Sequence, residues 1–156
     1  MKSLLLILFL SMFLCLNVRG QEVIRQVACF DSTLKKEADS LKAHFYAQGF
    51  VVVREATMMM ESEYEMPIIV PLNEGSFYQF VFIGDLSSKV YEVRMYDYRE
   101  KQVFFKKNYG EDVQGNIISY AYIPRFSEYH MIKPVQVNNK KKKNVCGYIL
   151  MFKKVR

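Results

Sequence analysis

The stretch GFVVVREATM, residues 49–58, marks the point at which the chain changes from a helical pattern to a strand pattern. Three consecutive valines follow Gly49, and β-branched residues of this kind are favoured in strands. Seven further ranges are rich in Val, Ile, Tyr and Phe and are bounded by turn residues: 66–72, 77–83, 90–96, 102–109, 117–123, 131–137 and 145–152. About eight short strands predict a mainly β protein, an antiparallel β-sandwich of jelly-roll type, with a barrel as the alternative.

The segment before Gly49 has the pattern of one amphipathic helix. Its apolar residues recur at spacings of three and four, at Val27, Phe30, Leu34, Ala38, Leu41 and Phe45. Asp31 and Ser32 offer N-cap oxygens, and Gly49 suits the position after the C-terminus. We therefore expect an N-terminal segment, residues 21–49, whose helix packs on a β-sandwich formed by residues 50–156, with membrane-surface binding as the alternative.

The first twenty residues have the layout of a secretory signal peptide. Lys2 precedes an apolar run at residues 4–16, and small residues at Val18 and Gly20 precede a cleavage point before Gln21. The apolar run is shorter than the ~20 residues that span a bilayer, so a short membrane anchor is the weaker interpretation. The prediction is an exported protein, periplasmic or extracellular, with no stable membrane insertion after cleavage.

Length and charge narrow the function classes. Removing residues 1–20 leaves one domain's worth of chain and removes Lys2 and Arg19, which lowers the net charge from +6 to +4. This modest excess comes without a nucleic-acid-binding motif, so we expect no nucleic acid partner. The lysine run at residues 140–143 is most simply a solvated hairpin tip between two strands, with a polyanion-binding patch as the alternative.

Two cysteines, Cys29 and Cys146, remain after the signal peptide is removed, because Cys15 lies within it. In an oxidising compartment an even pair favours a disulfide. On the chain-entropy model, closing a loop of ~100 residues contributes about 4.7 kcal/mol of stability. The alternative is two buried free thiols that pack as small apolar groups, and the sequence leaves both open.

Two neighbouring stretches carry a family resemblance. PLNEGSFYQFVFIGD, residues 71–85, places a glycine turn before a strand of alternating aromatics, and VYEVRMYD, residues 90–97, follows. This pair resembles the central hairpin of bacterial pre-peptidase C-terminal domains, which are small β-sandwich accessory modules of exported proteins. The preceding helix and the lack of an attached peptidase depart from that pattern. The resemblance implies a non-catalytic binding or accessory role in a bacterial envelope, and it transfers no functional residue.

The chemistry of catalysis has little support in the sequence, and we assign neither a catalytic residue nor a cofactor-binding residue. The chain has no Gly-flanked serine elbow, no zinc-ligand spacing and no Gly-rich phosphate loop. Its two histidines are His44 and His130, and spacing does not exclude a nucleophile pair of Cys146 with His130.

The segment MMMESEYEMP, residues 58–67, concentrates three carboxylates. If the segment is extended, Glu61, Glu63 and Glu65 lie on one face, because strand side chains alternate. Three carboxylates at this spacing would suit calcium, a hard cation that takes oxygen ligands, although no calcium-loop consensus is present and an acidic solvated strand or loop is the simpler interpretation. The alternatives are an acidic strand or loop paired with Lys or Arg from an adjacent strand, or a glycosidase acid and base.

Aromatic residues offer a second site hypothesis. The chain has 11 Tyr and no Trp, and Tyr120 and Tyr122 share one face of a predicted strand while Tyr64 lies in the acidic segment. Exposed rings on a β-sandwich can stack on sugar faces, so we consider these three as ligand-binding residues and core packing as the alternative. We predict an exported, non-enzymatic binding or accessory protein with an unknown protein or glycan partner. The alternatives are a carbohydrate-binding module, assisted by calcium, and a small envelope hydrolase.

Overall fold

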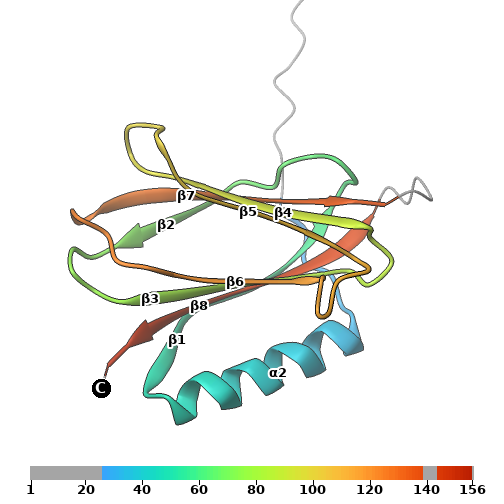
Figure 1. Ribbon diagram of the computed structural model, residues 1–156, viewed down its shortest axis with the longest axis horizontal. Helices are drawn as coiled ribbons and strands as arrows, with labels where there is room; N and C mark the ends of the chain where they lie inside the picture. Colours follow the sequence, from blue (N-terminus) through green and yellow to red (C-terminus); the bar gives the residue numbers. More distant parts are fainter. Residues whose placement is uncertain (1–25, 139–143, 156) are drawn as a thin grey trace, which may run out of the picture.

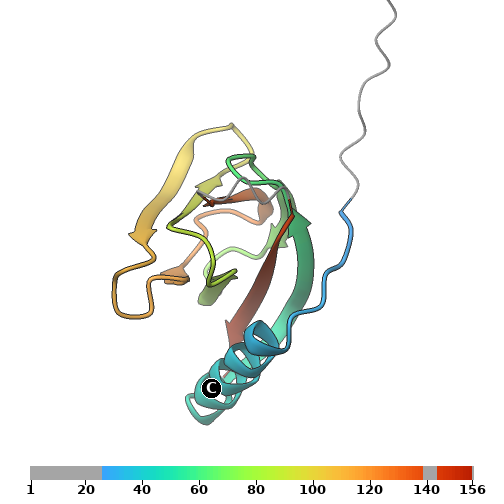
Figure 2. The same cartoon turned by 90° about the vertical axis from the view of Figure 1, so that its right-hand side faces the viewer.

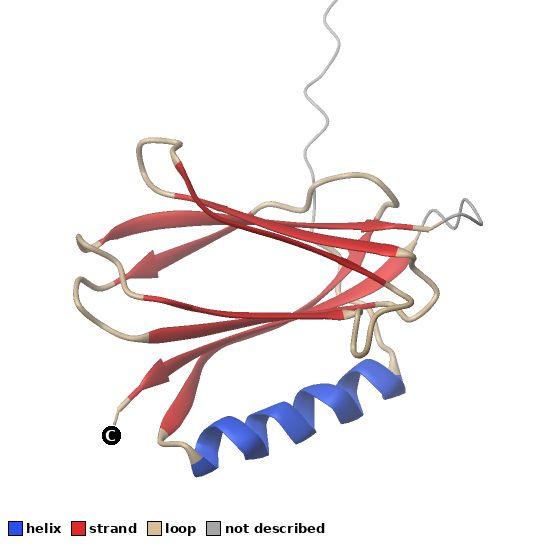
Figure 3. Ribbon diagram, in the orientation of Figure 1, coloured by secondary structure: helices blue, strands red, loops and turns tan. Residues whose placement is uncertain are grey.

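The structure is a computed structural model that describes residues 26–138 and 144–155. The predicted signal peptide, residues 1–20, and the lysine run at 140–143 lie outside the described residues. One helix, α2 (Ser32–Ala47), precedes eight strands: β1 (Phe50–Met60), β2 (Ile68–Leu72), β3 (Tyr78–Gly84), β4 (Val90–Tyr96), β5 (Gln102–Tyr109), β6 (Ile117–Tyr122), β7 (Glu128–Val137) and β8 (Val145–Lys154). Figure 3 shows the helix alongside the strands.

The strands form two antiparallel sheets of four. The helix-side sheet has the order β1-β8-β3-β6, and the open sheet has the order β2-β7-β4-β5. Figure 1 shows the two sheets stacked face to face, with α2 against the helix-side sheet. Successive strands alternate between the two sheets except for β4 and β5, which pair with each other. This is the arrangement of a jelly roll, so the predicted mainly β jelly-roll sandwich with a preceding helix is confirmed.

The order of the strands corrects two details of the sequence interpretation. β3 and β4 lie in different sheets, so they do not form the hairpin that the pre-peptidase resemblance implies. β7 and β8 also lie in different sheets, so these two strands do not pair as a hairpin. Alternating residue types in neighbouring strands do not distinguish a hairpin from a connection between sheets, because both use the same period of two.

Helix α2 begins as the sequence predicts. The Asp31 side chain caps it by accepting hydrogen bonds from the backbone N–H groups of Thr33 and Leu34, at 2.8 and 3.0 Å. Val27 and Phe30 lie before the helix and are exposed, so they are not part of its buried face. Within the described ranges, no helix combines the length and the apolar character needed to cross a membrane.

Two apolar layers hold the molecule together. The larger lies between the sheets and includes Phe82, Tyr91 and Met95, all almost fully buried. The second lies between α2 and the helix-side sheet, where Leu34, Ala38 and Phe45 pack on residues of β3 and β8. Figure 2 shows the helix seen end-on beside β1 and β8. β8 is buried on both faces along most of its length, which explains its nearly continuous apolar sequence.

A disulfide joins Cys29 and Cys146, whose Cα atoms are 5.8 Å apart, so the disulfide prediction is confirmed. It ties the segment before α2 to the start of β8. Beside it, the Val27 carbonyl accepts a 2.7 Å hydrogen bond from the backbone N–H of Met59 in β1. The entry to the helix is therefore fixed to the helix-side sheet by both a covalent and a backbone contact.

Candidate functional site

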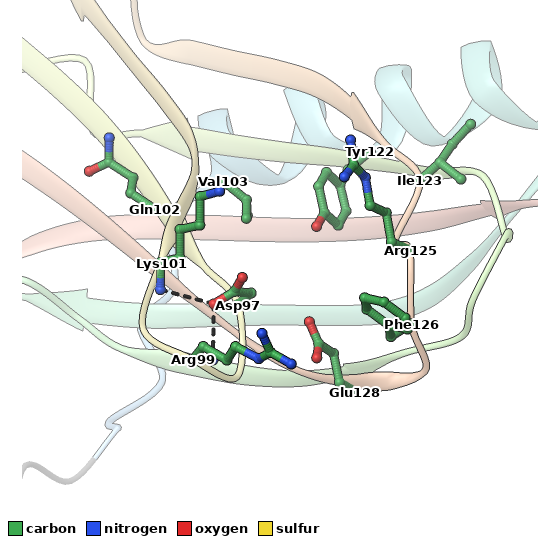
Figure 4. A pocket seen from close by; sticks show the side chains of 10 residues that line it. All are labelled: Asp97, Arg99, Lys101, Gln102, Val103, Tyr122, Ile123, Arg125, Phe126 and Glu128. Atoms are coloured by element: carbon green, nitrogen blue, oxygen red, sulfur yellow. Dashed lines mark hydrogen bonds between the residues drawn. The ribbon is translucent and has the colours of Figure 1, made fainter.

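Three connections meet at one end of the sandwich: residues 73–77 between β2 and β3, residues 97–101 between β4 and β5, and residues 123–127 between β6 and β7. Figure 1 shows them together at the left. A groove of about 530 Å³ lies between the second and the third of these connections. We call it the end groove. Figure 4 shows its side chains, with Asp97, Arg99 and Lys101 on one wall and Arg125 and Phe126 on the other.

The first wall is a turn organised by one carboxylate. Asp97 Oδ1 accepts hydrogen bonds from the backbone N–H groups of Arg99 and Lys101, both at 2.9 Å. Glu100 adopts a left-handed backbone conformation, with φ of 59°, to close the turn. Because Asp97 fixes the backbone, the turn presents the exposed side chains of Arg99 and Lys101 from a defined position.

The second wall is a loop supported by the neighbouring β2–β3 connection. The Pro124 carbonyl accepts a 3.0 Å hydrogen bond from the backbone N–H of Gly75. The Ser127 hydroxyl accepts one from the backbone N–H of Glu74 at 2.9 Å. Arg125 and Phe126 lie between these two contacts, and the Phe126 side chain is 63% exposed. The loop therefore holds an exposed aromatic ring and a cation on an ordered backbone.

Tyr122 lines the end groove and forms a hydrogen-bonded pair with the buried His130. The Tyr122 hydroxyl and His130 Nε2 are 3.0 Å apart, and Glu128 Oε1 lies 3.7 Å from the same nitrogen. His130 is buried, and its Nδ1 has no hydrogen-bond partner among the described residues. Burial raises the pKa of Tyr122, with a further contribution from the carboxylate of Glu128. Its hydroxyl therefore stays protonated at neutral pH and suits hydrogen bonding.

The basic and the acidic side chains that line the end groove differ in the contacts they make. Among the described residues, no ion pair involves Arg99, Lys101 or Arg125. The two lining carboxylates already have contacts, since Asp97 accepts the turn N–H groups and Glu128 lies near His130. The lining therefore carries three cations against two carboxylates, and the cations come from both walls.

The three predicted tyrosines do not form one platform. Tyr120 is buried between the sheets and stacks on Phe104, with ring centroids 3.7 Å apart. Burial raises its pKa. Tyr122 lines the end groove, whereas Tyr64 is exposed in the connection between β1 and β2, at the opposite end of the sandwich. Tyr120 is therefore too buried to belong to an exposed platform, and of these three tyrosines only Tyr122 lines the end groove.

The acidic segment leaves strand β1 after Met60, and residues 61–67 form a turn and an irregular connection. Glu63 has a left-handed φ of 75°, so the alternation that would align the three glutamates is broken. Glu65 pairs with Arg94 of β4 and Lys133 of β7, at 2.8 Å each, which is the contact to adjacent strands considered above. Within the described residues, no three acidic, His or Cys side chains are placed to hold one metal ion. Calcium binding by Glu61, Glu63 and Glu65 stays a prediction.

The disulfide bears on the nucleophile hypothesis that pairs Cys146 with His130. Cys146 is bonded to Cys29, so its sulfur is not a free thiol that His130 could activate. His130 Nε2 instead forms a hydrogen bond with the hydroxyl of Tyr122. The pairing of Cys146 with His130 is therefore wrong for the disulfide-bonded protein.

Sequence reasoning missed Arg99, Lys101, Arg125 and Phe126. All four lie in connections between strands, where single basic or aromatic residues have no periodic pattern. The available signal was the topology itself, because a jelly roll brings the β4–β5 and β6–β7 connections to the same end.

Comparisons with known proteins find distant structural similarity only. No protein-family model matches the chain, and no curated protein matches it. The chain is similar to the K3 adhesin domain of Lys-gingipain from Porphyromonas gingivalis, at 9% identity over 65% of this chain and 74% of that one, with a TM-score of 0.41. It is also similar to TmCBM61, solved in complex with β-1,4-galactotriose, at 11% identity over 69% and 83% of the two chains, with a TM-score of 0.37.

A third similar structure is AlgX from Pseudomonas aeruginosa, at 8% identity over 67% of this chain and 27% of that one, with a TM-score of 0.45. At these identities and TM-scores, no ligand, activity or site residue passes from these proteins to this chain. The resemblance of residues 71–97 to pre-peptidase C-terminal domains remains a prediction.

Proposed function

We propose that this chain is an exported, non-enzymatic binding protein that holds its ligand in the end groove. The observation that carries the proposal is a groove of about 530 Å³ whose two walls present one exposed aromatic ring and three cations that form no ion pair with another described residue. A volume of this size lies within the range of small-ligand sites. Aromatic and arginine side chains also dominate the energetics of binding surfaces.

Hydrogen bonds hold the backbone of both groove walls in place, and this order favours ligand binding. Asp97 fixes one wall, and contacts from Glu74 and Gly75 fix the other. A groove that is already ordered loses less conformational entropy when a ligand enters it. The Tyr122 hydroxyl adds a hydrogen-bonding group to the groove lining.

Export rests on two observations. The disulfide between Cys29 and Cys146 fits an oxidising compartment, such as the periplasm or the extracellular space. The layout of residues 1–20 is that of a secretory leader. Both fit a protein that meets its partner outside the cytoplasm.

The proposal is tested by screening the purified protein against soluble oligosaccharides by calorimetry, with a matched pair of variants. Phe126→Ala removes the exposed ring of the groove, and Phe105→Ala removes a ring that is 51% exposed on β5, outside the groove lining. We expect Phe126→Ala to weaken binding by about tenfold or more and Phe105→Ala to leave it unchanged. Loss of binding in Phe105→Ala alone would place the site on the open sheet and contradict the proposal.

A calcium-assisted site is tested in the same series. Titration of calcium into the protein, with and without the triple substitution of Glu61, Glu63 and Glu65 to Gln, measures whether these carboxylates bind the ion. Heat of binding that disappears in the triple variant would support the calcium prediction. No heat in the unsubstituted protein would show that it does not bind calcium.

A further inference from the structure

Resting on the proposed function, we infer that the ligand of the end groove is an acidic saccharide, a sugar chain that carries carboxylate and hydroxyl groups on the same ring. Oligomers of uronic acids are the simplest members of this class. The inference follows from the mixture of charged groups in the groove, in which unpaired cations and carboxylate acceptors line one cavity together.

The cations account for the acidic part of the ligand. Arg99 belongs to the β4–β5 turn and Arg125 to the β6–β7 loop, so a ligand in the groove has a guanidinium group on either side. A guanidinium group recognises a carboxylate through two parallel hydrogen bonds, which makes arginine the preferred partner for this group. Lys101 adds a third positive charge beside Arg99 without the same geometric demand.

The carboxylates of Glu128 and Asp97 and the hydroxyl of Tyr122 would bind the hydroxyl groups of the ligand. Glu128 and Asp97 line the groove and accept hydrogen bonds, and the Tyr122 hydroxyl lies between the two walls. A ligand that offered only carboxylates would be repelled by Glu128 and Asp97, whereas sugar hydroxyls can donate to them. The exposed ring of Phe126 supplies an apolar surface for the C–H face of a sugar ring.

These features favour a saccharide over an acidic peptide. A peptide of aspartate or glutamate residues has flexible carboxylates and no cluster of hydroxyl donors, so it matches the arginines and leaves Glu128 and Asp97 opposed by like charge. A uronate ring satisfies the cations, the acceptors and the aromatic surface with one rigid unit. We therefore take the acidic peptide as the contrasting outcome of the test.

The test is isothermal titration calorimetry of the disulfide-intact protein with matched ligands. The acidic probes are oligomers of galacturonate, of mannuronate and guluronate, and of hyaluronan. The neutral probes are galactotriose, mannotriose and fully methyl-esterified oligogalacturonate, which keeps the sugar and removes its charge, and hexaglutamate is the peptide probe. We expect at least one acidic oligosaccharide to bind tenfold or more tightly than its neutral match, and its affinity to fall as salt is raised.

Two groups of variants test whether the cations that bind the acidic ligand are those of the end groove. Arg99→Ala and Arg125→Ala should each weaken binding of the acidic oligosaccharide about tenfold or more, because each removes a charge-assisted contact. Lys36→Ala on α2 and Lys106→Ala on β5 remove the same charge from exposed positions outside the groove lining and should leave binding unchanged. Unfolding curves of all four variants check that the fold persists.

Several results would overturn the inference. A neutral oligosaccharide that binds as tightly as its acidic match and is lost in Phe126→Ala overturns the acidic class and leaves the proposed function intact. Hexaglutamate binding equal to that of the uronates overturns the saccharide class. The absence of binding by every uronate also overturns the inference, and equal losses in the groove and control variants would overturn the proposed function as well.

Discussion

At the scale of single residues, the end groove depends on side chains that fix the backbone around it. Asp97 is the clearest case, because one oxygen accepts two backbone hydrogen bonds across the β4–β5 turn. Arg99 and Lys101 are placed by that contact and not by packing, since both side chains are exposed. The positions of the cations are therefore set by a residue that carries the opposite charge.

The turn gives a first prediction. Asp97→Ala should lower the free energy of unfolding by about 0.5–1.5 kcal/mol and weaken ligand binding, because two backbone N–H groups lose their acceptor. Asp97→Asn keeps a side-chain oxygen in place and should retain most of both properties. Urea unfolding and calorimetry of the two variants measure these effects. Equal stability of Asp97→Ala and the unsubstituted protein would show that the turn does not need this contact.

Tyr122 gives a second prediction. Tyr122→Phe removes the hydroxyl that faces His130 Nε2, while the ring that lines the groove remains. Because His130 is buried, its nitrogen then lacks this partner, and we expect a loss of about 1–3 kcal/mol in the free energy of unfolding. The double variant Tyr122→Phe with His130→Leu should recover part of that loss. An unchanged midpoint in urea for Tyr122→Phe would contradict this assignment.

At the scale of elements, α2 is held to the helix-side sheet by polar contacts as well as by its apolar face. Lys42 of α2 pairs with Glu55 of β1 at 3.0 Å, and the Tyr148 hydroxyl of β8 donates a hydrogen bond to the same carboxylate. The hydrogen bond from Tyr148 lowers the pKa of Glu55, and Lys42 lowers it further. This carboxylate therefore links the helix to two strands.

The lowered pKa gives a prediction with a defined sign. A carboxyl group whose pKa is lower in the folded state stabilises the protein above its unfolded value of about 4.3, and the contribution is lost as pH falls through the folded pKa. Glu55→Gln should therefore be less stable than the unsubstituted protein at pH 7, by about 0.2–1 kcal/mol because the pair is partly exposed. Unfolding at pH 7 and below pH 4 should show this difference shrinking in acid.

The control for this measurement is Glu111→Gln, an exposed carboxylate in the connection between β5 and β6. It should show no such pH-dependent difference. If Glu55→Gln differs from the unsubstituted protein by the same amount at both pH values, the carboxylate charge does not contribute to helix docking.

The elements also show how far the sequence predicts the structure. All eight strands and α2 follow from local patterns, because β-branched and aromatic runs, turn residues and the Asp31 cap act over a few residues. β7 begins at Glu128, three residues before its predicted start, because Glu128 and Tyr129 pair with Leu72 and Pro71 of β2. Such a boundary depends on a partner strand that local sequence does not reveal.

At the scale of the whole molecule, the disulfide closes nearly the entire described chain. Cys29 precedes the helix and Cys146 begins the last strand, so the bond restricts the unfolded chain over 117 positions of sequence separation. The double substitution of both cysteines to Ser should lower the free energy of unfolding by about 2–5 kcal/mol. Thermal unfolding measures this loss, and thiol titration of the denatured, unreduced protein should find neither cysteine free. Unchanged stability of the double variant would contradict a structural role.

The candidate site was less predictable than the fold, for a physical reason. The predicted calcium site used three glutamates that are neighbours in sequence, Glu61, Glu63 and Glu65. In the structure, Glu65 forms ion pairs with residues of β4 and β7. The end groove instead joins residues from two connections that are separate in sequence, and Arg99 and Arg125 meet only after the sheets have formed. Proximity created by topology has no local signature.

The central claim is that the end groove is the binding site of this protein. Nuclear magnetic resonance spectra of ¹⁵N-labelled protein, recorded while the tightest oligosaccharide of the panel is added, test it most directly. We expect the shifted backbone amides to cluster at residues 97–103 and 122–128, and Phe126→Ala to abolish the shifts. Shifts confined to residues 61–67 at the other end of the sandwich, or to the outer face of the open sheet, would contradict it.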